Sequence, residues 1–265
     1  MICLMCTLEP YRIDWLPQFV AHYRAQGVER FLLTLQIDPE LPEDEKTRHR
    51  TRFGETLAQM DVTETFFWEH VWDGPSMGAH HRLLQEDHVG AADWIAWCDS
   101  DEFQVYPERL DRIVAQCEAA GVDFLRGVFI DRIAGDGSLA AFDPRRSIWE
   151  TFPRTCSVTN ALAKADPCKV ALARGSLRLL GGGKHRPEGN ALKTLGGFVQ
   201  VHHFKWDAAL LERLKFRVRP EWQARFPWWL ESQRLLDYFD VHGQRFDLAD
   251  VAPISIQGPH FIAVA

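Results

Sequence analysis

Short apolar runs alternate with amphipathic segments through the first half of the chain, and this alternation constrains the fold more than any other feature. Residues 2–8 form an apolar run typical of a buried strand, and residues 14–27 follow with a helical pattern. The same pair of patterns then repeats along the chain. The further predicted strands are residues 28–37, 62–71, 94–98 and 122–130, and the further predicted helices are residues 43–60, 77–89 and 107–120.

Repeated strand–helix units favour one kind of architecture. Right-handed βαβ crossovers place the strands in a mainly parallel sheet with helices on both faces. We therefore expect an α/β fold of the Rossmann-like type. In such folds ligands bind beyond the carboxyl ends of the strands, so candidate site residues are sought there.

The regular alternation weakens after about residue 135. The later segments with a strand or helix pattern are residues 169–180 and 198–203 (strands) and residues 207–217 and 228–242 (helices). We expect one α/β domain over residues 1–205 and a mostly helical extension over residues 206–265 that packs on it. A chain of 265 residues can bury a sizeable core in this way.

Charge and composition exclude several classes of protein. The net charge of −7 and the pI near 5.9 argue against nucleic acid as a partner, because backbone binding needs a basic field. No basic leader precedes an apolar segment and no apolar run reaches the length of a membrane span, so we expect no integral membrane segment and a cytoplasmic protein. The six cysteines are too scattered for a disulfide scaffold, and we expect them to stay reduced.

An acidic cluster follows the apolar run of residues 94–98. Asp99, Asp101 and Glu102 stand at the end of this predicted buried strand, where carboxylates are costly unless they are paired or bound to a metal. Mn²⁺ or Mg²⁺ is a suitable partner, because these ions combine one or two carboxylates with phosphate oxygens of a substrate. The alternative is a solvated surface cluster of salt bridges.

These acidic residues have distinct expected roles. Asp101 would ligate the metal, and Asp99 would hold either a nucleotide ribose or a metal-bound water. Glu102 would orient its neighbours. Asp38 and Asp131 also follow predicted strands, so three separate segments of the chain can converge on one site.

Histidines later in the chain supply further candidates. His202 and His203 lie on a predicted strand, so one faces the site and the other faces away, and an inward His203 could complete the metal shell with Asp101. Lys184 and His185 follow three glycines and could cradle a diphosphate. The alternatives are a hydrogen-bonded structural histidine and a plain mobile turn. His80, His81 and His88 are interpreted as surface or packing residues.

Three segments resemble the family-two-like glycosyltransferases of GT-A fold, especially the group related to family 92. The His-Tyr pair within residues 16–23, the Gly-Val-x-x-Phe strand at 27–31 and the Asp-x-Asp-Glu-Phe motif within 94–103 carry the resemblance. Lys169, His185 and the His202–His203 pair follow in the order seen in that family. The resemblance covers about residues 1 to 205. One departure stands at Leu8, where the family has Asn before the glutamate.

The resemblance implies a metal-dependent enzyme. It implies a nucleotide-diphosphate-sugar donor, Mn²⁺ or Mg²⁺ as cofactor, and a saccharide or other hydroxyl acceptor, with Glu9 and Asp38 near the nucleotide. The expected reaction is sugar transfer in surface polysaccharide or glycoconjugate synthesis. An inverting transferase needs a base, and Asp131 is the first candidate, with Asp207 or Glu188 as alternatives and a structural ion pair between Asp131 and Arg132 as the non-catalytic interpretation.

Two other functions remain open from the sequence. A nucleotidyltransferase or a metal-dependent phosphohydrolase uses the same acidic cluster with nucleotide phosphates. A non-catalytic domain that binds a carbohydrate or a partner on a transferase scaffold is favoured by Leu8.

Overall fold

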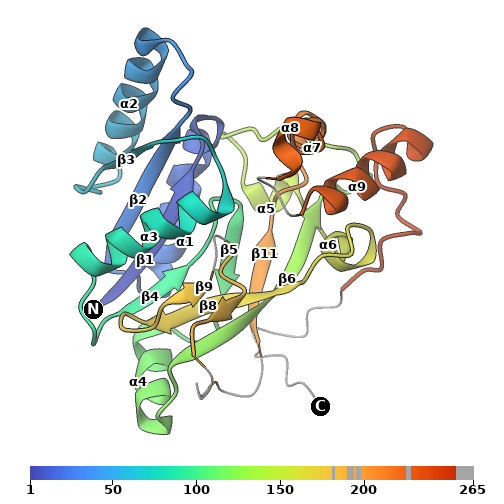
Figure 1. Cartoon of the computed structure of the whole chain (residues 1–265). Coiled ribbons are helices and arrows are strands. Elements are labelled where there is room, and N and C mark those ends of the chain that lie inside the picture. Colours follow the sequence, from blue (N-terminus) through green and yellow to red (C-terminus); the bar gives the residue numbers. More distant parts are fainter. Residues whose placement is uncertain (181–182, 190–193, 195–197, 225–227, 255–265) are drawn as a thin grey trace.

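The computed structural model describes residues 1–180, 183–189, 194, 198–224 and 228–254 (Figure 1). The elements in chain order are β1 (Ile2–Leu8), the 3-10 helix η1 (Pro10–Trp15), α1 (Leu16–Gln26), β2 (Arg30–Ile37), α2 (Glu43–Ala58), β3 (Phe66–Glu69), α3 (Gly74–His88), β4 (Trp94–Trp97), β5 (Glu102–Val105), α4 (Leu110–Ala120), β6 (Phe124–Ile133), α5 (Ile148–Thr151), β7 (Arg154–Cys156), α6 (Val158–Ala161), β8 (Cys168–Arg174), β9 (Leu179–Leu180), β10 (Arg186–Pro187), β11 (Val199–His203), α7 (Leu210–Arg217), α8 (Pro220–Gln223) and α9 (Trp229–His242).

One large sheet organises the described part of the chain. Its strand order is β3-β2-β1-β4-β8-β6-β11-β5, and β7 pairs with β6 outside this path. Strands β1, β2, β3, β4, β6 and β11 run in one direction, whereas β5, β7 and β8 run against them. This arrangement confirms the predicted α/β class with a mostly parallel sheet flanked by helices.

Side chains of β1 alternate between the two faces of the sheet and are buried on both. Leu4 and Cys6 belong to an apolar core that also contains side chains of α1, α2 and α4, whereas Met5 packs in a second core with Leu84 of α3. All seven residues of β1 are buried, which explains why Thr7 is the one polar residue in its sequence and polar positions do not alternate with apolar ones.

A third apolar cluster joins the C-terminal helices to the sheet. Trp206, Leu210 and Phe239 pack there with Ile133 at the end of β6 and Val158 of α6. Helices α7, α8 and α9 therefore gather near the end of the sheet at which β11 and the other parallel strands finish (Figure 1). No helix in the described ranges is long and apolar enough to cross a membrane.

Several elements differ from the predicted ones. The segment after the acidic cluster forms strand β5, which pairs antiparallel with β11 through partners such as Glu102 and His203. Asp14, the first residue of the predicted helix 14–27, lies within η1, and α1 begins at Leu16, whereas Asp73 caps α3 by accepting a hydrogen bond from the backbone N–H of Ser76 at 2.8 Å. Both differences arise from contacts distant in sequence or from local capping that apolar periodicity does not report.

Candidate functional site at the carboxyl edge of the sheet

The acidic cluster forms a tight turn between β4 and β5. The backbone N–H of Glu102 donates to the carbonyl of Asp99 at 3.0 Å, and the Glu102 carboxylate accepts the backbone N–H of Asp99 at 2.9 Å. The Asp101 carbonyl accepts the N–H of Phe204 at 2.7 Å, just beyond β11. These bonds fix the three carboxylates beside the end of β11.

The chain itself supplies cations for Asp99. The amine of Lys184 lies 2.7 Å from Asp99 Oδ1, and the amine of Lys169 lies 3.9 Å from Asp99 Oδ2. Burial would raise the pKa of Asp99, but Lys169 and Lys184 outweigh it and hold the pKa well below its usual value. Lys184 is itself buried with a left-handed φ of 56°, a backbone strain that its contacts must offset.

Lys169 on β8 also pairs with Glu102 on β5. Both side chains are almost completely buried, at 0% and 1% exposure, and the amine contacts Glu102 Oε2. Burial acts to lower the pKa of Lys169, but Asp99 and Glu102 raise it above its usual value, so the amine keeps its proton. This buried ion pair therefore connects β8 to the acidic turn.

Asp101 has a different environment. Arg12 of η1 places Nη2 3.4 Å from Asp101 Oδ2 and Nη1 2.8 Å from Asp207, and Arg213 of α7 reaches Asp207 at 2.8 Å. Burial would raise the pKa of Asp101, but Arg12 and then His203 outweigh it and keep the pKa below its usual value. Asp101 therefore remains an anion beside His203.

His203 stands between two carboxylates. Its Nδ1–H donates to Asp131 Oδ1 at 3.0 Å, and its Nε2 lies 4.0 Å from Asp101 Oδ1. The ring stacks on Phe129, with the two ring centroids 4.5 Å apart. Because Asp131 accepts the hydrogen bond from Nδ1–H, Nε2 on the other side of the ring faces Asp101 and can meet a ligand.

Asp131 is a buried organising carboxylate. Besides His203, it accepts the N–H and the hydroxyl of Thr159 at 2.6 and 2.7 Å and the indole N–H of Trp206 at 2.9 Å. It is 1% exposed and is not among the described residues that line the two cavities of this edge. The structure therefore places Asp131 behind His203, with its oxygens already engaged by hydrogen bonds, and the base role predicted for Asp131 stays a prediction.

Two cavities meet over the acidic turn. The larger encloses about 520 Å³ and the smaller about 110 Å³. Both are lined by Trp72, Asp99, His203, Lys205 and Arg217.

The two cavities differ in their remaining walls. The smaller cavity extends to Thr7 and Glu9 at the end of β1, and burial raises the pKa of Glu9. The larger cavity extends to Phe129, Trp228 and Glu231, and its volume matches that of small-molecule sites. The acidic turn and His203 therefore lie where two compartments join.

Three charged side chains of the C-terminal part face these cavities without an ion pair. Lys205, Arg217 and Glu231 form no ion pair or side-chain hydrogen bond with any residue in the described ranges, and Lys205 contacts the Trp206 ring. The sequence singled out none of the three, because each belongs to a segment that reads as an ordinary amphipathic helix or strand end.

The structure brings together most of the predicted site residues. Glu9 lines the smaller cavity, and His185 lines the larger one while its Nδ1–H donates to the Cys168 carbonyl at 2.5 Å. Asp38 is exposed, accepts the backbone N–H of Glu40 at 2.9 Å, and is not among the described lining residues. The predicted contact of Asp38 with a nucleotide stays a prediction, as does that of Lys184 with a diphosphate, because the Lys184 amine is held by Asp99.

The paired histidines face opposite sides of β11, as the alternation predicted. His202 is buried against Trp149, with ring centroids 4.9 Å apart, on the side away from the cavities. His81 on α3 is also buried, and its Nε2 lies 2.8 Å from the hydroxyl of Thr7. Glycines 181 and 182 of the predicted flexible loop lie outside the described residues.

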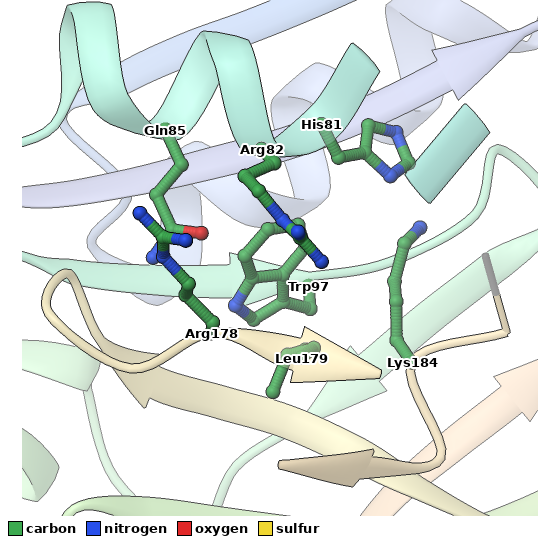
Figure 2. Close-up of a pocket in the computed structure, with 7 residues that line it drawn as sticks. All are labelled: His81, Arg82, Gln85, Trp97, Arg178, Leu179 and Lys184. Atoms are coloured by element: carbon green, nitrogen blue, oxygen red, sulfur yellow. The ribbon is translucent and has the colours of Figure 1, made fainter. Parts of the chain in front are cut away.

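Lys184 closes the cluster on the side of α3. Figure 2 shows its side chain extending toward His81, beside a hollow whose walls include Gln85, Trp97 and Arg178. The hollow encloses about 10 Å³, enough for about one water molecule and too little for a substrate. Lys184 therefore acts on Asp99 from behind the two larger cavities.

A divalent cation fits Asp101 and His203 better than it fits Asp99. Asp101 Oδ1 and His203 Nε2 face each other at 4.0 Å, and one ion at the usual ~2.0–2.2 Å from each ligand can contact both. Lys184 and Lys169 face both oxygens of Asp99, whereas Arg12 contacts Asp101 only at Oδ2. Among the described residues, a set of three potential donors within mutual reach occurs at His242, Asp247 and Asp250, which do not line the two cavities.

Comparisons with known proteins find only distant structural similarity. No family model and no curated protein matches the chain. A solved 4-diphosphocytidyl-2C-methyl-D-erythritol synthase is 13% identical, covering 66% of this chain and 75% of that one with a TM-score of 0.32. A UDP-glucose pyrophosphorylase complexed with UDP-glucose is 12% identical, covering 52% and 60% with a TM-score of 0.25. The function is therefore inferred from the chemistry of the site.

Proposed function

We propose that this protein is a glycosyltransferase that moves a sugar from a nucleotide-diphosphate-sugar donor to a hydroxyl acceptor. The observation that carries the proposal is the junction of two cavities over Asp99, Asp101 and His203. Group transfer needs two substrates side by side, and a larger compartment beside a charged junction gives an acceptor its own place. Trp72 and Trp228 add aromatic surface suited to sugar rings.

The chain's own residues prepare the donor side. Asp131 orients His203, and Arg12 keeps Asp101 ionised, so this carboxylate and imidazole would together hold Mn²⁺ or Mg²⁺. A bound ion would neutralise the charge that develops on a departing diphosphate. Lys169 and Lys184 hold Asp99 in the acidic turn, and Asp99 is left to contact the donor's hydroxyl groups.

Glu231 is better placed than Asp131 to take the acceptor's proton. It lies in the first turn of α9, lines the larger cavity, and has no ion-pair partner among the described residues. Burial raises the pKa of Glu231, although Lys205 and His185 act against this. A carboxylate with a raised pKa is a stronger base than an ordinary surface glutamate. We therefore assign the base role to Glu231 and a positioning role to Asp131.

A donor panel tests the proposal. Thermal melting would be recorded with nucleotide-diphosphate sugars, with and without Mn²⁺, for the wild type, for Asp101→Ala and for the exposed control Asp136→Ala. A matching donor at 100 times its Kd should stabilise the fold by about 2.7 kcal/mol. We expect that shift with Mn²⁺ in the wild type and the control, and its loss in Asp101→Ala.

Product analysis separates glycosyl transfer from nucleotidyl transfer. Glycosyl transfer releases a nucleoside diphosphate, whereas nucleotidyl transfer from a nucleoside triphosphate releases pyrophosphate. Both fit an acidic junction beside unpaired cations, but the larger cavity favours an acceptor over a small phosphate. Pyrophosphate release with no nucleoside diphosphate would contradict the proposal, and so would an absence of any donor-dependent shift.

A further inference from the structure

Two cations at the junction of the cavities form no ion pair with any described residue. Lys205 follows β11 and Arg217 ends α7, and both line the larger and the smaller cavity. Neither forms an ion pair or side-chain hydrogen bond with any residue that the structure describes. Asp101 and Glu231 act on Lys205 only from beyond ion-pair distance, so an anion from outside the chain can be the direct partner of both cations.

The other cations around the acidic turn are already engaged. Lys169 pairs with Glu102, Lys184 with Asp99, Arg12 with Asp101 and Asp207, and Arg213 with Asp207. These four cations meet four carboxylates of the protein. Lys205 and Arg217 therefore differ from their neighbours in forming no ion pair with a described residue at the place where two substrates would meet.

Lys205 and Arg217 place two like charges on the shared wall of the two cavities. A single ligand with two or more negative charges can contact both, and an Arg beside a Lys suits phosphate oxygens, since Arg binds them through two N–H groups.

Resting on the proposed function, we propose that Lys205 and Arg217 clamp the phosphate oxygens of the donor's diphosphate. Their place at the junction fits the leaving group, which lies between the nucleotide and the sugar. An anionic acceptor could supply phosphate oxygens from the larger cavity instead, and the experiment distinguishes these two sources. Lys205 and Arg217 would thus supply part of the diphosphate binding without a metal.

Inorganic pyrophosphate is the direct probe, because it carries the phosphates without a base or a sugar. Its affinity would be measured by calorimetry in EDTA for the wild type, Lys205→Met and Arg217→Gln. Lys215→Met on the exposed side of α7 and Arg112→Gln on α4 are controls with the same charge change. We expect each clamp variant to lose at least tenfold in affinity and both controls to stay within twofold.

The outcomes separate the clamp from the proposed function. Tenfold weaker pyrophosphate binding in the clamp variants supports the clamp even if no nucleotide sugar is turned over. Unchanged pyrophosphate binding overturns the clamp even if glycosyl transfer is observed. In an active enzyme, removing either clamp residue should raise the KM for the donor. A rise confined to the KM for the acceptor would also overturn the clamp.

A second measurement, made on the wild type alone, tests the clamp if the variants do not fold. Hydrogen exchange of the wild type would be compared with and without pyrophosphate. Protection concentrated on residues 204–217 supports the clamp, because this segment carries both cations. Protection confined to other parts of the chain, or no protection at saturating pyrophosphate, overturns it.

Discussion

His203 and Asp131 form a buried hydrogen bond that aims the imidazole at the acidic turn. Nδ1 of His203 lies 3.0 Å from Asp131 Oδ1, while Nε2 on the far side of the ring lies 4.0 Å from Asp101. Carboxylates that hold a metal-binding histidine in this way fix both its orientation and its tautomer. The pair therefore links the interior of the fold to the chemistry at the cavity junction.

Replacing Asp131 should weaken metal binding even though Asp131 is buried behind His203. Asp131→Asn offers the ring an amide that can no longer select the Nε2 lone pair, so the affinity for Mn²⁺ should fall about 10- to 100-fold. Calorimetric titration of Mn²⁺ measures this loss, and the exposed Asp136→Asn serves as the control. Equal Mn²⁺ affinity in Asp131→Asn and wild type would mean that the carboxylate has no part in positioning a ligand.

The buried pair of Lys169 and Glu102 should dominate the stability of the site. Lys169→Met removes the cation that pairs with Glu102 and one of the two cations near Asp99. The free energy of unfolding should therefore fall by about 3–5 kcal/mol. Lys169→Met combined with Glu102→Gln should recover part of that loss, because no buried charge is then left unpaired.

Urea denaturation of the two single variants, the double variant and Lys215→Met measures this coupling. Lys215 is exposed on α7, so its removal should change stability by less than about 0.5 kcal/mol. If the losses in the two single variants simply add in the double variant, the two side chains do not act as a pair.

The activity of the proposed transferase should depend on the protonation of Glu231. The base works only when ionised, and burial raises its pKa, so kcat should fall with decreasing pH at values above the usual glutamate range near ~4.3. Glu231→Gln should lower kcat by about 10²- to 10⁴-fold, with the donor affinity preserved. The exposed Glu212→Gln is the matched control. A Glu231→Gln enzyme with normal kcat would show that Glu231 is not the base.

The sequence predicted the sheet and the acidic turn because their signals are local. Apolar runs mark the strands, and the abrupt change from Trp97 to Asp99 marks a strand end. It could not predict β5, because four residues become a strand only through pairing with β11, about a hundred residues away. The cations that neutralise Asp99, and the free Glu231, likewise depend on tertiary placement that periodicity does not carry.

The packing of β6 against its neighbours offers a test of the fold that is independent of function. A Cβ added to Gly127 would lie 2.5 Å from Val201 Cγ2 and 3.2 Å from the Cβ of Ala171, so neighbouring strands would have to move. Gly127→Ala should therefore lower the free energy of unfolding by about 1–3 kcal/mol. Gly54→Ala in α2 meets no atom within 4 Å and should raise stability by about 0.5–1 kcal/mol, since alanine favours a helix. Urea denaturation of both variants gives opposite signs if β6 lies between β8 and β11, and an equal response would contradict this strand order.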